Sequence, residues 1–196
     1  CYGLLHGLSL HYHVYHAVLK QILRPLESLG QRLLNGLGYD PLPLYREDFE
    51  SPVSRPELAK EYPLMLITGS RFHPMYHSEH RNIDSVRKRH PNPLLQVNPK
   101  TAGELGIADG DWVWIETLRG RVKMKSCLFE GVAANVVHAE HGWWFPELPG
   151  EEPWLHGVWE SNINVCTTDE PEHCNTISGG WPLRTLMCKV YKVKTY

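Results

Sequence analysis

Residues suited to binding an anion gather where the first strongly apolar run of the sequence ends. Residues 64–68 (LMLIT) predict a short buried strand, and Gly69 follows it directly. Glycine has no side chain to keep a ligand away from backbone N–H groups. Thr68 and Ser70 add hydroxyl donors, and Arg71 can bond two phosphate oxygens at once. The segment is a candidate ligand site; the alternative is an ordinary strand end with a surface arginine.

Three histidines follow this segment closely. His73, His77 and His80 have a spacing that would suit metal ligands on one helix face, but Pro74 interrupts such a helix and no fourth ligand is evident. We instead expect a ligand-binding loop in which His77 and Ser78 form hydrogen bonds. Solvated histidines and a histidine-rich metal-binding module remain as alternatives.

A His-Gly-Trp-Trp loop follows a later apolar segment. Gly142 permits close approach of a ligand to the backbone, and the His141 imidazole can donate or accept a hydrogen bond. Trp143 and Trp144 are large apolar side chains that we expect to pack against the end of the fold. The prediction is therefore divided, with His141 and Gly142 at a ligand and the tryptophans in the interior.

Two asparagines form a third candidate group. Asn162 and Asn164 flank Ile163 on an expected extended segment, where alternate side chains point the same way. An amide offers a donor and an acceptor to the edge of a heterocycle. The alternative is a pair of turn asparagines. Arg184, which follows Gly-Gly-Trp-Pro, is a further candidate for contact with a ligand.

The elements that must position these residues are mostly short strands, which indicates a closed barrel of mixed strands. Asn98 should cap a short helix that has Pro99 at its first position and Gly106 beyond its end, with Ala102 and Leu105 facing inward. A second short helix is expected at 79–90. The strands are expected at 64–68, 94–97, 112–117, 122–125, 132–139 and 183–193.

Three parts of the chain are expected. Apolar residues at helical spacing predict one helix over 14–35, interrupted at Pro25, within a helical tail of a preceding domain at 1–38. Proline-rich residues 39–61 predict an extended linker. Residues 62–196 form the barrel domain.

Composition excludes several classes of protein. The 196 residues are 42% hydrophobic and 21% charged with a net charge of −2, so no strong field favours nucleic acid or an anionic membrane. Five cysteines form no C-x-x-C pair, which argues against a zinc ribbon or an iron–sulfur cluster held by this chain. No membrane-spanning run or secretory signal is seen. We expect a piece of a longer polypeptide whose compartment, cytoplasm or periplasm, would be encoded upstream.

Five motifs in a fixed order resemble one family. They are LITGSR (66–71), YHSEHR (76–81), VNPKTAGELGIADGDWVWIETLRGRV (97–122), HAEHGWWFPE (138–147) and SNINVCT (161–167). Together they resemble the C-terminal cofactor domain of the dimethyl sulfoxide reductase (molybdopterin oxidoreductase) family. Residues 36–43 and 50–64 resemble the linker of its thiosulfate reductase and acetylene hydratase-like branch. The family more often reads Thr-Gly-Arg where this chain has an additional Ser70.

The resemblance implies a double-psi β-barrel that binds molybdopterin guanine dinucleotide and catalyses nothing alone. Molybdenum or tungsten would be ligated by missing domains, and an iron–sulfur cluster would lie only in a missing N-terminal domain. The partners would be the other domains of the parent catalytic subunit, together with an iron–sulfur electron-transfer subunit. An alternative is a stand-alone barrel enzyme of the aspartate-decarboxylase type. The implied cofactor-binding residues are Thr68, Gly69, Ser70, Arg71, His77, Ser78, His141, Gly142, Asn162, Asn164 and Arg184.

Overall fold

A computed structural model describes residues 29, 32, 36, 45–70, 72–175 and 179–194 of the chain. The chain divides into two compact units, residues 1–46 and 47–196. Of the helix expected over 14–35, only Leu29 and Arg32 lie within the described residues, and both are helical. The rest of that helix, with Pro25, lies outside them. The second unit holds all the elements that follow.

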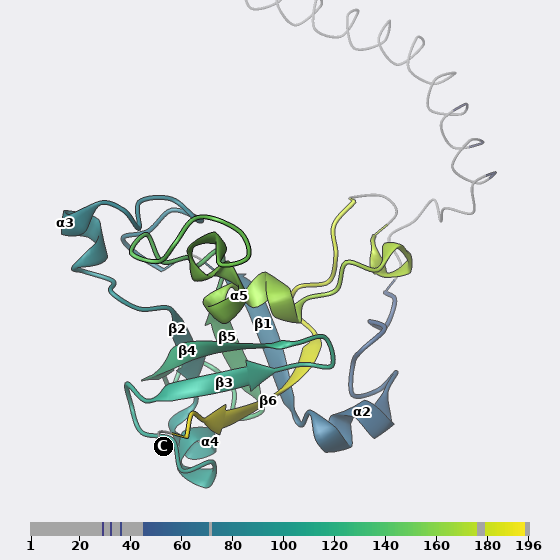
Figure 1. The fold of residues 1–196 in the computed structure, drawn as a ribbon. Coiled ribbons are helices and arrows are strands. Elements are labelled where there is room, and N and C mark those ends of the chain that lie inside the picture. The colour runs from purple at the N-terminus through teal and green to yellow at the C-terminus, as the bar shows by residue number, and fades with distance from the viewer. Residues whose placement is uncertain are drawn as a thin grey trace, which may run out of the picture. The chain divides into compact units, whose positions relative to one another are not determined.

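Six strands of the second unit close into a barrel (Figure 1). The order around the barrel is β1-β5-β2-β4-β3-β6. The barrel and its small helices confirm the predicted mainly-β barrel class. The strands are β1 (Leu64–Ser70), β2 (Leu94–Val97), β3 (Trp112–Glu116), β4 (Arg121–Leu128), β5 (Val136–Glu140) and β6 (Leu186–Lys192).

The pairing of β1 with β5 decides where the candidate residues lie. The two strands are parallel, from the pair Met65↔Val136 to the pair Ser70↔Glu140. Parallel strands end at the same edge of a sheet, so the loops that follow both strands leave the barrel together. The register shifts between Ile67 and Ser70, where Gly69 has a φ of +89°. Glycine tolerates this conformation, which a side chain would disfavour.

Alternating residues of the strands fill the barrel. Val113 and Ile115 of β3, like Val122 and Met124 of β4, have no exposed surface. This is the period-two pattern that the sequence predicts for strands with one buried face. On the outer face, the ammonium group of Lys125 lies 5.6 Å from the ring centroid of Trp112, so part of the expected wet face is covered by aromatic rings.

The predicted capped helix is present as α4 (Pro99–Glu104). The Asn98 side-chain oxygen accepts a hydrogen bond from the backbone N–H of Lys100 at 3.0 Å, and its amide nitrogen donates to the Val132 carbonyl at 2.7 Å. Ala102 is fully buried, as expected. Leu105 is 40% exposed, so its predicted inward orientation is wrong. The helix ends one residue earlier, at Glu104, and does not carry Leu105 onto its buried face.

Several local predictions need correction. The helix expected at 79–90 is reduced to α3 (Asp84–Arg87), because His80 has a φ of +71° and cannot join a right-handed helix. The strand expected at 132–139 starts at Val136, whose N–H bonds the Ala133 carbonyl in a turn. The strand expected at 183–193 is present but shorter, as β6 (Leu186–Lys192). The linker predicted as extended contains α2 (Pro56–Glu61).

Short helices complete the second unit after β5. None of the helices within the described residues is long and apolar enough to span a membrane. The remaining helical elements are η1 (Leu155–Gly157), α5 (Val158–Ser161), η2 (Ile163–Cys166) and η3 (Pro171–His173).

Replacing Leu95 by Ala should strongly destabilise the barrel. Leu95 is fully buried in the core, so the substitution removes apolar contacts and leaves a cavity that costs about 2–5 kcal/mol of unfolding free energy. Leu105→Ala is the matched control, since that residue is already 40% exposed. Urea unfolding of both variants measures the difference. Equal losses would contradict the assignment of the core.

Candidate functional site

The end of β1 presents an open backbone edge at Gly69. A Cβ atom added at this glycine would meet no atom within 4 Å. Thr68 is buried, and both its N–H (2.8 Å) and its hydroxyl group (3.2 Å) donate to the Leu183 carbonyl. The Thr68 hydroxyl proton therefore bonds a protein carbonyl and cannot be donated to a ligand. Only the backbone of Ser70 is described, and Arg71 lies outside the described residues.

The loops that follow β1 and β5 meet at the surface. His77 Nδ1 lies 3.0 Å from His141 Nε2, and the indole N–H of Trp144 donates to the Ser78 carbonyl at 2.6 Å. Gly142 has a φ of +67°, and a Cβ atom there would lie 3.4 Å from Ser78. The structure thus brings together four residues singled out from the sequence: His77, Ser78, His141 and Gly142.

Trp143 is buried beneath these loops, as predicted. Its side chain has no exposed surface, and guanidinium groups lie against its ring, with the Arg81 Cζ atom 4.7 Å and the Arg87 Cζ atom 5.0 Å from the centroid. These distances suit cation–π contacts. Trp144 is only partly buried, so it links the two loops through its indole N–H more than it fills the interior.

The prediction of an extended segment around Ile163 is wrong. Asn162 ends α5, and residues Ile163–Cys166 form a 3-10 helix. The Asn162 side-chain oxygen accepts the backbone N–H of Asn164 at 3.1 Å, which is the geometry of a turn asparagine. The two amides therefore have different surroundings, and Asn164 lines a cleft of the described structure.

The cleft beside Asn164 has a volume of about 650 Å³. It is a groove lined by both polar and apolar side chains, and it also contains Leu183, the residue bonded to Thr68. Of its polar residues only Asn164 was predicted from the sequence, although the polar run Thr168–Glu170 directly follows the motif SNINVCT. His77, Ser78, His141 and Gly142 are not among its lining residues. The cleft is lined by Arg119, Asn164, Val165, Thr167, Thr168, Asp169, Glu170, Gly180, Trp181 and Leu183.

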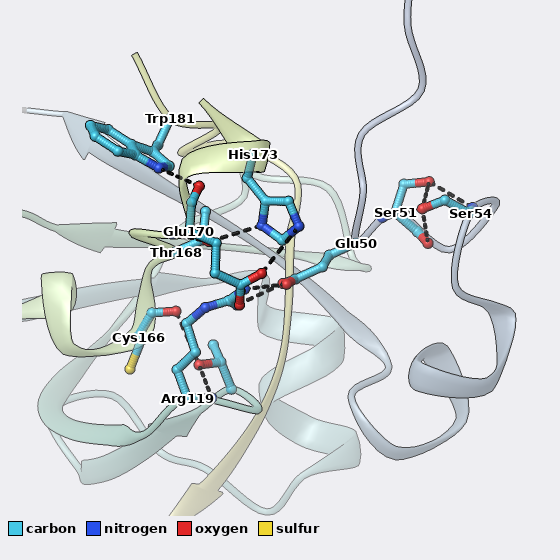
Figure 2. A network of polar contacts seen from close by, with 10 residues as sticks. Glu50, Ser51, Ser54, Arg119, Cys166, Thr168, Glu170, His173 and Trp181 are labelled. Carbon is cyan, nitrogen blue, oxygen red and sulfur yellow. Dashed lines mark hydrogen bonds and ion pairs between the residues drawn. The ribbon is translucent and has the colours of Figure 1, made fainter. Parts of the chain in front are cut away.

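An ion-pair network holds one wall of this cleft (Figure 2). Arg119 forms two hydrogen bonds with the buried Glu50 carboxylate, one at 2.8 Å from Nη1 to Oε2, and Nη2 also lies 3.3 Å from Glu170. The bond to Glu50 raises the pKa of Arg119. Glu170 also pairs with His173 at 3.3 Å, and its carbonyl accepts the indole N–H of Trp181 at 3.0 Å. The network joins Glu50 of the predicted linker to the turn between β3 and β4.

His138 is a polar residue that was not among the candidates predicted from the sequence. It is 8% exposed, and its Nδ1 atom lies 2.8 Å from the Gln96 side-chain oxygen. The Nε2 atom is buried and has no hydrogen-bond partner within the described structure. Burial, and then the nearby charge of Arg184, lower the pKa of His138. The alternation of β5 was the available signal, because it places His138 on the opposite face from the core residue Val137.

Five of the predicted residues thus fall into two groups at one end of the barrel, four in the paired loops and one in the cleft. Figure 1 shows α5 and the loop after β5 near the ends of β1 and β5, with α4 at the opposite end. One group is the paired loops, and the other is the cleft with Asn164. Arg184 is exposed and directly follows Leu183. Leu183 lines the cleft and accepts hydrogen bonds from Thr68 of β1, so it connects the cleft to that strand. Among the described residues, no three His, Cys, Asp or Glu side chains are placed to hold a metal, so the metal-binding alternative has no support there.

Comparisons with known proteins match this part of the chain. Residues 64–184 match the family model described as "Molydopterin dinucleotide binding domain". The chain is 35% identical over 167 residues to acetylene hydratase of Syntrophotalea acetylenica, covering 84% of this chain and 23% of the relative. It is 39% identical over 151 residues to dopamine dehydroxylase of Eggerthella lenta, covering 77% of this chain and 14% of the relative.

A solved structure agrees with these matches. Acetylene hydratase from Pelobacter acetylenicus superposes with a TM-score of 0.77 at 34% identity, over 82% of this chain and 22% of that one. The chain therefore spans less than a quarter of the length of the relatives it matches.

Acidification should destabilise the folded chain through His138. The pKa of His138 is lowered from 6.5 in the folded state, so the unfolded state takes up this proton first as the pH falls through 6.5. Unfolding free energy is then lost, by up to about 1 kcal/mol for this group between pH 7.5 and 5.5. His138→Gln should reduce that loss in urea unfolding. Identical pH dependence in both proteins would contradict the prediction.

Proposed function

Because the chain belongs to the molydopterin dinucleotide binding domain family, we propose that it binds molybdopterin guanine dinucleotide as the C-terminal domain of a molybdenum or tungsten oxidoreductase catalytic subunit. The chain spans only part of its relatives, so the rest of the enzyme would surround the cofactor from other sides. This chain would bind and orient the ligand. The metal that the cofactor carries would supply the redox chemistry.

The contact between the two loops is the observation that carries the proposal. His77 and His141 are 64 positions apart in the sequence and meet at 3.0 Å at the surface. Imidazole groups, the Ser78 hydroxyl and the backbone at Gly142 are the kinds of group that hydrogen-bond a flat heterocycle. We assign this pair of loops to the pterin part of the cofactor.

The described residues fit such a ligand in two further respects. Nδ1 of His138 faces an acceptor oxygen of Gln96 and so carries the proton, which leaves the buried Nε2 as an acceptor without a partner. Gly69 offers backbone at an open edge, as a phosphate group requires. Both lie on the strands that carry the paired loops.

The remaining predicted residues take narrower roles. Arg71 and Arg184 would contact the phosphates or pterin oxygens, and Asn164 a heterocycle edge in the cleft. Thr68 would contribute as an acceptor only, because its hydroxyl proton goes to Leu183. Asn162 would contribute its amide N–H groups, since its oxygen caps a turn. Ser70 would act through its hydroxyl group, as the sequence predicts.

The proposal includes partners outside this chain. The helical tail at 1–38 and the linker at 39–61 would connect the barrel domain to the preceding domains of the same polypeptide. Those domains would ligate molybdenum or tungsten and hold an iron–sulfur cluster, and a separate iron–sulfur protein would transfer electrons. A relative in Allochromatium vinosum, 36% identical over 114 residues, is itself named as one subunit of a sulfite dehydrogenase.

Titration of the chain with molybdopterin guanine dinucleotide, followed by tryptophan fluorescence, tests the proposal. We expect weak binding, because the parent would supply most of the contacts. The double variant Arg71→Ala/Asn164→Ala should bind at least about tenfold more weakly, since each lost hydrogen bond to a charged or polar ligand group weakens binding. Asn135→Ala, at an exposed position before β5, is the matched control. Unchanged affinity of the double variant would refute the assigned site.

A further inference from the structure

Arg81 is a fully buried cation that contacts both loops of the proposed pterin site. Its Nη1 atom donates to the His77 carbonyl at 2.7 Å, and its Nη2 atom lies 3.4 Å from the His141 carbonyl. Nη1 also lies 3.4 Å from the Glu79 carbonyl. One planar guanidinium group therefore spans the backbone of the two loops. An ammonium group on a flexible stem does not have this fork of donors.

The loop that carries His77 has a backbone that needs support. His77 has a φ of +49° and His80 a φ of +71°, both in the left-handed region that non-glycine residues rarely occupy. Such conformations persist where surrounding contacts hold them. Arg81 donates to the carbonyls of His77 and Glu79, which belong to the stretch from His77 to His80. Arg81 therefore supports this unusual stretch directly.

Arg81 is itself held from the barrel side. Its Nη2 atom lies 3.4 Å from Glu140 Oε1, and Glu140 Oε2 lies 2.7 Å from His90 Nε2. The backbone N–H of Leu94, at the start of β2, donates to the same carboxylate at 3.4 Å. Glu140 is the last residue of β5 and is 1% exposed. Besides its bonds to the loop carbonyls, the guanidinium is thus anchored on the barrel through Glu140 of β5, whose carboxylate also accepts the N–H of Leu94 in β2.

The exposed side of the arrangement is the histidine pair. His77 and His141 face each other at 3.0 Å above the buried guanidinium, and the bond from Trp144 to Ser78 adds a second link between the loops. We propose that Arg81 is a positioning residue that sets the His77–His141 contact by holding both loop backbones to the barrel. Its consequence for ligand affinity rests on the proposed function.

Arg87 offers a matched control in the same cluster. Its guanidinium also lies against the Trp143 ring, but its hydrogen bonds go to Glu147 and to the Pro91 carbonyl. Arg81→Lys and Arg87→Lys are therefore the same chemical change beside the same aromatic ring. Only the first removes a guanidinium that bonds the His77 and His141 carbonyls.

Nuclear magnetic resonance of the imidazole groups, with no cofactor added, tests the positioning role. Signals are assigned with His77→Gln and His141→Gln. In the wild-type chain and in Arg87→Lys, we expect nuclear Overhauser effects between the two rings. In Arg81→Lys we expect these effects to be lost while the backbone amide signals of the barrel strands remain. Retention of the ring contacts in Arg81→Lys, or their equal loss in Arg87→Lys, would overturn the proposal.

A measurement on the wild-type chain keeps the test decisive if Arg81→Lys fails to fold. The guanidinium protons of Arg81 should show nuclear Overhauser effects to the α-protons of both His77 and His141. Effects to both residues support the bridge between the loops, and their absence overturns it.

Cofactor titration then separates the two proposals. In Arg81→Lys, affinity for molybdopterin guanine dinucleotide should fall about tenfold, the effect of one lost hydrogen bond. Wild-type affinity in a variant whose ring contacts are lost would overturn the consequence for ligand affinity. If the wild-type chain binds no cofactor but its ring contacts are lost in Arg81→Lys and kept in Arg87→Lys, the proposed function fails and the positioning role of Arg81 is supported.

Discussion

The parallel pairing of β1 and β5 is the constraint on which the rest of the site depends. Because both strands run the same way, Ser70 and Glu140 end side by side and the two loops that follow must share one edge of the barrel. The contact between His77 and His141 follows from that pairing. Backbone hydrogen bonds and a closed apolar core hold the pairing, so the loops start from a rigid base.

Two guanidinium groups, one fully buried and one partly buried, then hold the loop and cleft segments that the strand pairing leaves free. Arg81 with Glu140 stands under the paired loops, and Arg119 with Glu50 stands in the wall of the cleft. Removing a charge from water costs free energy, and burial lowers the pKa of Arg81 although Glu140 opposes that shift. Such pairs add little to stability, but their geometric demands select one arrangement of the segments that they join. Both pairs join segments distant in the sequence.

The local elements of the barrel were predictable where one physical signal dominated. Alternation identified β3 and β4, and Asn98 with Pro99 marked the start of α4, because caps and strand faces depend on neighbours in the sequence. The alternation argument gave a wrong prediction for Asn162 and Asn164, because the segment that follows Asn162 is a 3-10 helix that contacts β4. His138, Arg81 and the polar run after Cys166 were also overlooked, because their surroundings come from distant segments.

The sequence by itself determined the class of fold, the family resemblance and the loops that carry candidate groups, since motifs and periodicity are properties of neighbouring residues. Only the tertiary structure decided which candidates act together. It joined His77 to His141, directed the Thr68 hydroxyl to the Leu183 carbonyl, and used the Asn162 side-chain oxygen to cap a turn while Asn164 lines the cleft. The reason is physical: hydrogen-bond partners and burial depend on chain segments brought together by strand pairing, and that pairing links positions far apart in the sequence.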